Sequence, residues 1–180
     1  MKNTITFLLL VATMAIFSCK EKETPELEIQ LPAITSKGLN TFGCVVNGEI
    51  FVAGRGKEKA WNPTIISYMH YKDSIFSLLA KDYESNKVIS LETIYYSGDK
   101  NVSLYNPNSY DYASITEFID FNFFGGKQYL IQRTNDWRLH ISEDNDRFIS
   151  GTFSFDAINR EGGDTIHIRD GRFDVLKKVP

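Results

Sequence analysis

Three histidines are the side chains of this sequence best suited to acid–base or metal chemistry: His70, His140 and His167. None of them belongs to an H-x-H or H-E-x-x-H spacing, which would direct two imidazoles to one metal ion. His140 and His167 lie on the polar sides of stretches in which apolar and polar residues alternate. If those stretches are neighbouring strands, the two imidazoles form half of a metal site or supply a general base; otherwise they face solvent. We favour the solvent-facing interpretation and expect neither a metal nor a cofactor.

Other catalytic patterns point the same way. The sequence contains no G-x-S-x-G elbow, phosphate-binding loop or dinucleotide-binding glycine pattern. Glu143, Asp144 and Asp146 cluster, but a calcium-binding EF-hand loop needs a central glycine and a glutamate at its twelfth position, and this run has neither. We interpret the run as a hairpin turn whose side chains cap the backbone. We therefore expect no enzyme; a hydrolase that pairs His140 or His167 with a serine or carboxylate is a less favoured alternative.

Aromatic residues concentrate between positions 95 and 112, where five of the nine tyrosines lie. Tyrosine offers a flat, amphipathic contact area, and the interleaved asparagines offer adaptable hydrogen bonds, a mixture typical of recognition surfaces. Such a surface suits a glycan ring or a peptide. The alternative is that these side chains seal a long loop against the domain. The candidate ligand-binding residues are Tyr105, Asn106, Asn108, Tyr110 and Tyr112.

Short strands are expected to position these residues. From Thr41 onward the sequence is divided by turn signals, of which Asn47-Gly48 is the strongest, because a type I′ turn needs positive φ at both central residues. In "DWRLHIS", "GTFSFDA" and "DTIHIR" every second residue is apolar, which predicts strands with one buried face. The pattern predicts an all-β fold, either an antiparallel β-sandwich or a flattened barrel with hairpin connections, and does not separate the two.

The last predicted strand contains a change of phase. Ile166 and Ile168 have even numbers, whereas Phe173 and Val175 have odd numbers, so a bulge is expected near Asp170-Gly171. Beyond it, Arg172 and Asp174 share one face of the strand. We interpret them as an exposed ion pair, which contributes at most about 1 kcal/mol.

The N-terminal residues indicate export. An apolar run from Ile5 to Phe17 follows Lys2 and ends before Ser18-Cys19. It is shorter than the roughly 20 residues of a membrane-spanning helix and has the length of an export signal. The sequence "IFSC" that ends at Cys19 resembles the bacterial lipobox, which implies that the signal is removed and that Cys19 is acylated. Two or more acyl chains anchor a protein stably, so a membrane is the expected partner.

Three regions follow from this: a lipoprotein signal peptide over 1–18, a flexible tether over 19–38, and one all-β domain over 39–180. The tether is dense in charge and contains two prolines, and such a composition buries too little apolar area to offset its ordering entropy. A formal net charge of −3 argues against a nucleic-acid partner. Cys44 is expected to be a small buried hydrophobic residue. A Cys19–Cys44 disulfide is the competing interpretation, and it excludes acylation.

Two segments resemble the two ends of a family of uncharacterised bacterial lipoproteins with a domain of unknown function. The first, residues 31–51, carries Leu31-Pro32, Thr35, Gly38, Asn40-Thr41-Phe42-Gly43-Cys44 and Asn47-Gly48. The second, residues 149–175, carries Ser150-Gly151-Thr152-Phe153 and Gly171-Arg172-Phe173-Asp174-Val175. The resemblance implies an all-β lipoprotein and brings no established activity.

The expected location is the Gram-negative cell envelope. The charged stretch after Cys19 resembles signals that send some lipoproteins to the cell surface, so we expect a lipid anchor in the outer membrane, facing the periplasm or the exterior. A binding or interaction module of unknown ligand is the favoured function. The alternative is a lipocalin-like carrier of a small apolar ligand. A carrier requires an empty apolar interior, whereas a module has a filled core.

Overall fold

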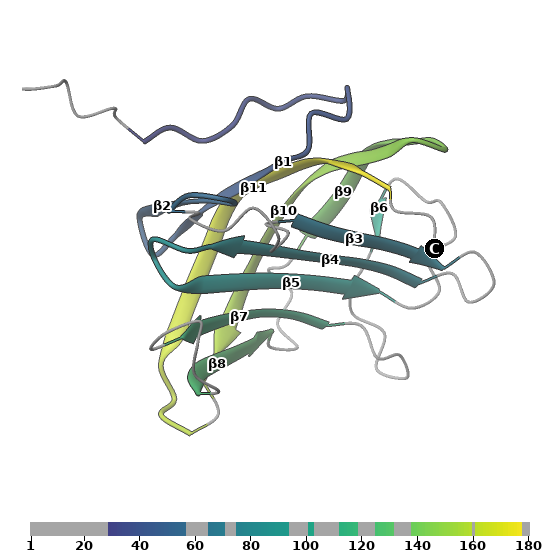
Figure 1. The fold of residues 1–180 in the computed structure, drawn as a ribbon. Helices are drawn as coiled ribbons and strands as arrows, with labels where there is room; N and C mark the ends of the chain where they lie inside the picture. The colour runs from purple at the N-terminus through teal and green to yellow at the C-terminus, as the bar shows by residue number, and fades with distance from the viewer. Residues whose placement is uncertain are drawn as a thin grey trace, which may run out of the picture.

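The computed structural model describes residues 29–56, 65–70, 75–93, 101–102, 112–118, 125–131, 138–159 and 161–177. These residues form strands and turns and include no helix, which confirms the all-β prediction (Figure 1). None of them belongs to a helix that is long and apolar enough to cross a membrane. The strands are β1 (Thr41–Val46), β2 (Glu49–Val52), β3 (Ile65–His70), β4 (Ile75–Asp82), β5 (Lys87–Thr93), β6 (Asn101–Val102), β7 (Tyr112–Phe118), β8 (Gly126–Ile131), β9 (Arg138–Asp144), β10 (Phe148–Ile158) and β11 (Thr165–Leu176).

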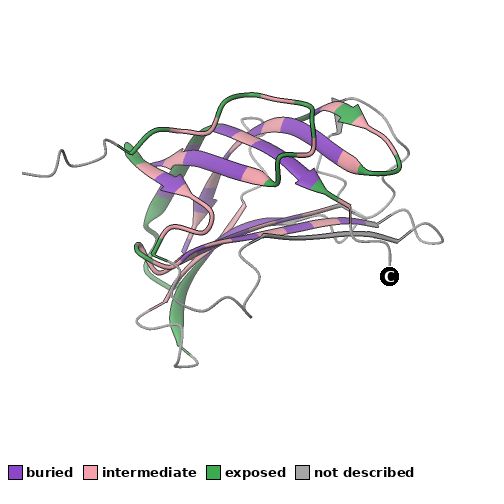
Figure 2. Ribbon diagram, turned by 45° about the horizontal axis from the view of Figure 1, so that its top comes forward, coloured by how far each residue is buried: buried purple, intermediate pink, exposed green. Residues whose placement is uncertain are grey.

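All pairings are antiparallel and form one strongly curved sheet, in the order β2-β1-β11-β10-β8-β7-β5-β4-β3. The sheet branches at β10, whose first half pairs with β9 and whose last two residues pair with β8. β6 adds to the outer side of β9. As a result, β1, β9, β10 and β11 lie over β4 and β5 as two layers of a nearly closed, flattened barrel (Figure 2).

The segment that follows β2 contacts the end of β4, so β1 and β2 lie close to β4 although they are at the opposite end of the strand order. The backbone N–H of Gly54 donates to the carbonyl oxygen of Lys81 at 2.8 Å, and the N–H of Tyr83 donates to that of Arg55 at 2.9 Å. The Arg55 guanidinium also pairs with Asp82, with 2.6 Å between Nη2 and Oδ2. Asp82 is fully buried, and a buried carboxylate is stable only when it is paired and hydrogen-bonded in this way.

The predicted Asn47-Gly48 hairpin is present between β1 and β2. Both central residues have positive φ, 49° at Asn47 and 91° at Gly48, as a type I′ turn requires. The Asn47 backbone N–H donates to the carbonyl oxygen of His167, and its side-chain oxygen accepts from the N–H of His167. The turn therefore also fixes the register of β1 against β11.

The variant Gly48→Val is expected to lower the free energy of unfolding by roughly 1–3 kcal/mol, because a β-branched residue is strained at positive φ. A Cβ atom at Gly48 would have no neighbour within 4 Å, so the loss reports backbone strain alone. Urea unfolding followed by circular dichroism measures it. An unfolding midpoint equal to that of the unmodified protein would contradict the strain argument.

The predicted alternation is confirmed in the strands that carry it. In β10, Phe153, Phe155 and Ala157 are buried between less buried neighbours, and in β9 Leu139 and Ile141 are buried beside exposed Arg138 and His140. Their apolar side chains point into the space between the two layers.

The change of phase in β11 is confirmed as a bulge. Phe153 of β10 pairs with Gly171, whereas Phe155 pairs with Ile168, so β11 holds two residues opposite one. The positive φ (51°) belongs to Asp170 and not to the glycine. Gly171 is required for space, since a Cβ atom there would lie 2.6 Å from the Phe153 ring.

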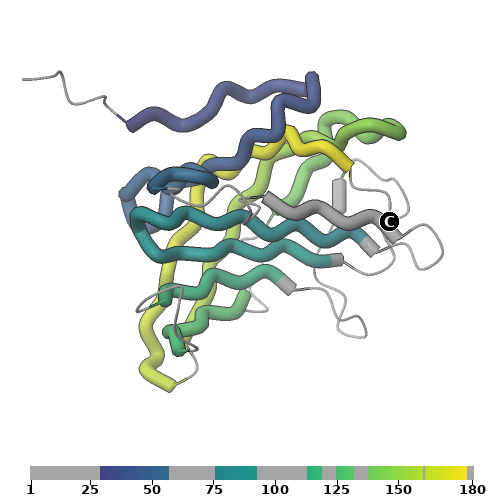
Figure 3. Tube along the Cα trace, viewed as in Figure 1, coloured from purple at the N-terminus to yellow at the C-terminus, as the bar shows by residue number. Residues whose placement is uncertain are grey.

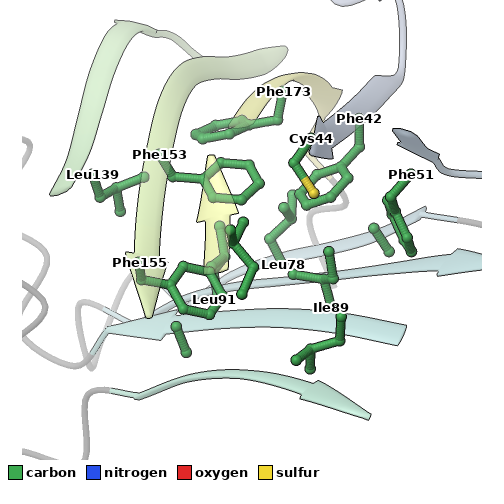
Figure 4. Close-up of a cluster of buried hydrophobic side chains, with 14 of the residues drawn as sticks. Phe42, Cys44, Phe51, Leu78, Ile89, Leu91, Leu139, Phe153, Phe155 and Phe173 are labelled. Atoms are coloured by element: carbon green, nitrogen blue, oxygen red, sulfur yellow. The ribbon is translucent and has the colours of Figure 1, made fainter. Parts of the chain in front are cut away.

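Phe153 lies at the centre of the core (Figure 4). Its ring centroid is 5.1 Å from that of Phe42, 6.3 Å from that of Phe155 and 6.4 Å from that of Phe173. Buried residues of β4 and β5, including Leu78, complete the cluster from the opposite layer. Burial of each such side chain contributes about 1.5–3 kcal/mol. The space between the layers is thus occupied by side chains at these positions.

Candidate binding surface

The N-terminal segment 29–39 packs on the outer face of the layer that contains β1 and β11 (Figure 3). Asp174 of β11 fastens it. One carboxylate oxygen of Asp174 accepts from the Thr35 hydroxyl at 2.6 Å and from the backbone N–H groups of Lys37 and Leu39 at 3.0 and 3.3 Å, and the other accepts from the N–H of Gly38 at 2.7 Å. The segment therefore lies in a defined position above β11.

These contacts correct the sequence-based interpretation of Asp174 as half of an exposed ion pair with Arg172. Asp174 is only 1% exposed because segment 29–39 covers it. Burial by itself raises the pKa of its carboxyl group, but the hydrogen bonds from Thr35 and the backbone amides outweigh burial, so this pKa lies below its ordinary value. Arg172 also holds the segment, because its Nη1 donates to the carbonyl oxygen of Pro32 at 3.3 Å.

A groove of about 380 Å³ lies beside this segment, on the outer face of β9, β10 and β11. We call it the outer-face groove. The strand register places the side chains of the groove in two rows across the sheet. One row contains His140, Thr152 and Arg172. The other contains Arg138 and Ser154 and lies beside the bulge. Its lining residues are Ile34, Arg138, His140, Thr152, Phe153, Ser154, Arg169, Asp170, Gly171 and Arg172.

The bulge of β11 is what brings two arginines to the groove. Arg169 and Arg172 are three positions apart, so a regular strand would direct them to opposite faces. The guanidinium of Arg169 bonds to Asp156 at 2.7 Å and to the carbonyl oxygens of Phe155 and Ile168 at 3.1 and 2.9 Å. The Arg169 contact holds the pKa of Asp156 below its ordinary value. Arg172 donates through Nε to the Asp170 carbonyl oxygen at 3.1 Å. Both side chains are thus oriented by the protein itself.

The two candidate histidines do not come together. His140 of β9 pairs across the sheet with Thr152, whereas His167 of β11 pairs with Asp156, four residues further along β10. The Nδ1 atom of His167 lies 2.9 Å from the carboxylate of Asp156. Within the described ranges, no group of three or more His, Cys, Asp or Glu side chains is placed to hold a metal ion.

The hairpin turn interpreted from the sequence is present but is shorter than the acidic run, because Glu143 and Asp144 still belong to β9. The side-chain oxygen of Asn145 accepts from the backbone N–H groups of Arg147 and Phe148 at 3.0 and 3.1 Å and caps the β9–β10 hairpin. Asp144 pairs with Lys177. Cys44 is a free thiol, fully buried in the core, and burial raises the pKa of this thiol, so it has the environment of a hydrophobic residue and not of a nucleophile.

The other predicted site residues fall largely outside the described residues. Cys19, Tyr105, Asn106, Asn108 and Tyr110 all do. Tyr112 begins β7, and its backbone pairs with Glu92 of β5. The proposed acylation and the tyrosine-rich surface therefore stay predictions.

Comparisons with protein-family models, with curated proteins and with solved structures give no match for this chain. The resemblance to a lipoprotein family thus stays a prediction as well. What the structure adds is a role for the residues that carry it. The two end segments are partners in space, since β1 pairs with β11, with Phe42 opposite Phe173 and Gly43 opposite Arg172.

Proposed function

We propose that this chain is a lipid-anchored binding module of the cell envelope, attached to the outer membrane through acyl chains on Cys19. The observation that carries the proposal is the division between a filled interior and a hollowed, polar outer face. The rings of Phe42, Phe153 and Phe173 occupy the interior, whereas most of the residues that line the outer-face groove have charged or other polar side chains. A protein with a filled interior and such a groove binds its ligand on its outer surface. The proposal assigns no catalytic residue.

The fastened N-terminal segment supports the same function. Asp174 and Arg172 hold residues 32–39 against the outer face, and the chain toward Cys19 leaves the domain at Ile29, which lies near Glu49 and Ile50 of β2. Nine residues lie between Cys19 and Ile29, and the ten steps from Cys19 to Ile29 reach at most about 35 Å when extended. An anchor at Cys19 therefore keeps the domain within this distance of the membrane. The tyrosine-rich segment 95–112 remains a second candidate surface for a glycan or peptide.

One observation favours the alternative function, a lipocalin-like carrier of a small apolar ligand. A hollow of about 330 Å³ opens at the β1–β2 end of the barrel and is partly lined by Val46, Ile50 and Phe51. Its border carries Glu49 and Lys87 together with Arg55. Charged groups at the entrance of so small a site suit a fully apolar ligand poorly, since their desolvation is costly. We therefore favour the module.

Replacement of Cys19 by alanine tests the anchor. When cells that make the unmodified chain are labelled with radioactive palmitate, the protein is expected to carry label and to sediment with membranes, because acyl chains hold it there. The Cys19→Ala variant is expected to lose both properties. Cys44→Ser serves as the matched control, since Cys44 is buried and is expected to leave labelling unchanged. Label retained on Cys19→Ala would refute the lipid anchor.

A further inference from the structure

We propose that the outer-face groove binds the acidic group of a saccharide, a carboxylate or phosphate. This inference rests on the proposed function as a binding module and names the chemistry of its ligand. Arginine is the side chain suited to such groups, because its planar donors match a carboxylate or phosphate in two parallel hydrogen bonds. The groove presents three arginines: Arg138 from β9, and Arg169 and Arg172 from the two sides of the β11 bulge.

The arginines are arranged around a common centre. Across the sheet, Arg138 is opposite Ser154, and Arg172 is opposite Thr152. Neighbouring strands lie about 4.8 Å apart, so the guanidinium groups of β9 and β11 can approach the space above β10 from both sides. An acidic group placed above the two hydroxyls of β10 is therefore within reach of arginines on either side.

Two of the arginines are held in place before any ligand binds. Arg169 is fixed by Asp156 and two carbonyl oxygens, and Arg172 by the carbonyl oxygens of Asp170 and Pro32. None of these bonds uses the Nη2 atom of either residue, so donors remain for a ligand. Side chains that are already ordered lose little entropy on binding, which raises affinity.

Arg138 differs from the other two. It is exposed, and no ion pair or side-chain hydrogen bond to it occurs among the described residues. No described residue therefore occupies its guanidinium group. The groove also has an excess of positive charge, since three arginines meet Asp170 and Asp156, whereas the whole chain has a formal net charge of −3.

The remaining lining favours a sugar over a bare ion. A volume of about 380 Å³ is at the lower end of the range for small-molecule sites, roughly 300–1,000 Å³, and is larger than one oxyanion needs. The hydroxyls of Thr152 and Ser154 both donate and accept hydrogen bonds, as sugar hydroxyls require. Ile34, which is 64% exposed, provides an apolar wall from the N-terminal segment. A sugar ring offers both kinds of surface.

Calorimetric titration of the full chain in detergent tests the inference with three probes: trigalacturonate, uncharged maltotriose, and phosphatidylglycerol carried in micelles of the same detergent. We expect trigalacturonate to bind at least about tenfold more tightly than maltotriose, and Arg138→Gln to remove about tenfold of that affinity. Arg147→Gln is the matched control. It makes the same charge change at the exposed opposite end of the β9–β10 hairpin and is expected to leave affinity unchanged. Added salt should weaken the binding.

Three results would overturn the inference: equal affinity for the two saccharides, equal losses in Arg138→Gln and Arg147→Gln, or Arg138-dependent binding of the phosphatidylglycerol micelles without binding of trigalacturonate. The last would assign the groove to phospholipid headgroups. Because Arg138 has no structural partner among the described residues, its variant is expected to keep the melting temperature of the unmodified protein, which separates a lost contact from unfolding. Failure of palmitate labelling at Cys19 would remove the membrane anchor and leave this inference standing.

Discussion

Gly151→Ala is expected to lower the free energy of unfolding by about 3 kcal/mol or more, a large effect for a single methyl group. A Cβ atom at position 151 would lie 2.2 Å from the carbonyl oxygen of His140 and 2.8 Å from the ring of Phe173. Neither neighbour can yield cheaply, because the first is backbone of the paired strand β9 and the second is a buried core ring. Insertion of the methyl group therefore separates two strands or displaces the core.

Chemical unfolding followed by circular dichroism measures this loss. Gly125→Ala is the matched control, since a Cβ atom at Gly125 would have no neighbour within 4 Å and this glycine does not have positive φ. That variant is expected to change stability by no more than about 0.5 kcal/mol. If the two variants unfold at the same denaturant concentration, the close approach of β9 and β11 around Gly151 is not as described.

The strands that carry a clear alternation could be predicted from the sequence. Phe153 and Phe155, or Ile166 and Ile168, are separated by one polar residue, and a period of two has only one structural explanation when the polar residues face outward. The Asn47-Gly48 turn could be predicted for the same local reason, because positive φ at two consecutive positions restricts the residue types. A pattern among a few neighbouring residues therefore predicts the backbone conformation of those residues.

The role of Asp174 could not be predicted in this way. Alternation within β11 places Asp174 on the outer face, and a charged residue on an outer face is ordinarily exposed. It is buried because a segment about 135 residues earlier in the chain lies over it. Nothing within β11 records that contact. The resemblance motifs did contain both partners, Thr35 and Gly38 in the first and Asp174 in the second, but a motif shared by a family does not reveal which of its residues touch.

The outer-face groove could be predicted from the sequence only in part. Alternation assigned Arg138 and His140 to one polar face, and Arg169 to another. Consecutive hairpins commonly place β9, β10 and β11 side by side, so the juxtaposition of these faces could have been expected. The predicted change of phase near Asp170-Gly171 also placed Arg172 on a polar face, but it could not predict the carbonyl oxygens of Asp170 and Pro32 that hold the guanidinium group of Arg172. The sequence pointed to the tyrosine-rich segment 95–112 as a binding surface, whereas the groove that we propose as a binding site is lined by three arginines.

Asp174→Asn is expected to lower the free energy of unfolding by roughly 2–4 kcal/mol, since hydrogen bonds to a charged acceptor are strong and their loss leaves a buried polar side chain with fewer partners. The carboxylate accepts four hydrogen bonds from Thr35, Lys37, Gly38 and Leu39. An asparagine side chain has only one acceptor oxygen. Its NH₂ group would face backbone N–H groups that now donate to the second carboxylate oxygen. Asp146→Asn, which makes the same charge change at an exposed position of the β9–β10 turn, is the control and is expected to have little effect.

Release of the N-terminal segment gives a second readout of the same variant. Trypsin cleaves after lysine, and Lys37 lies within the segment that Asp174 holds. Cleavage at Lys37 is expected to be faster in Asp174→Asn than in the unmodified protein or in Asp146→Asn, because proteolysis requires a locally released backbone. Equal cleavage rates in all three proteins would show that Asp174 does not fasten this segment.

The pH dependence distinguishes the charge of Asp174 from its shape. Its carboxyl group has a lowered pKa in the folded protein, so it contributes stability at pH values above the pKa of the unfolded chain, about 3.9 for aspartate. That contribution is lost as the pH falls through the lower pKa of the folded state, because both states then bind the proton. We therefore expect the difference in unfolding free energy between the unmodified protein and Asp174→Asn to be constant above about pH 5 and to narrow below about pH 4. A difference that stays constant down to the acid transition would mean that the ionised carboxylate is not what holds the segment, and that the shape of the side chain is sufficient.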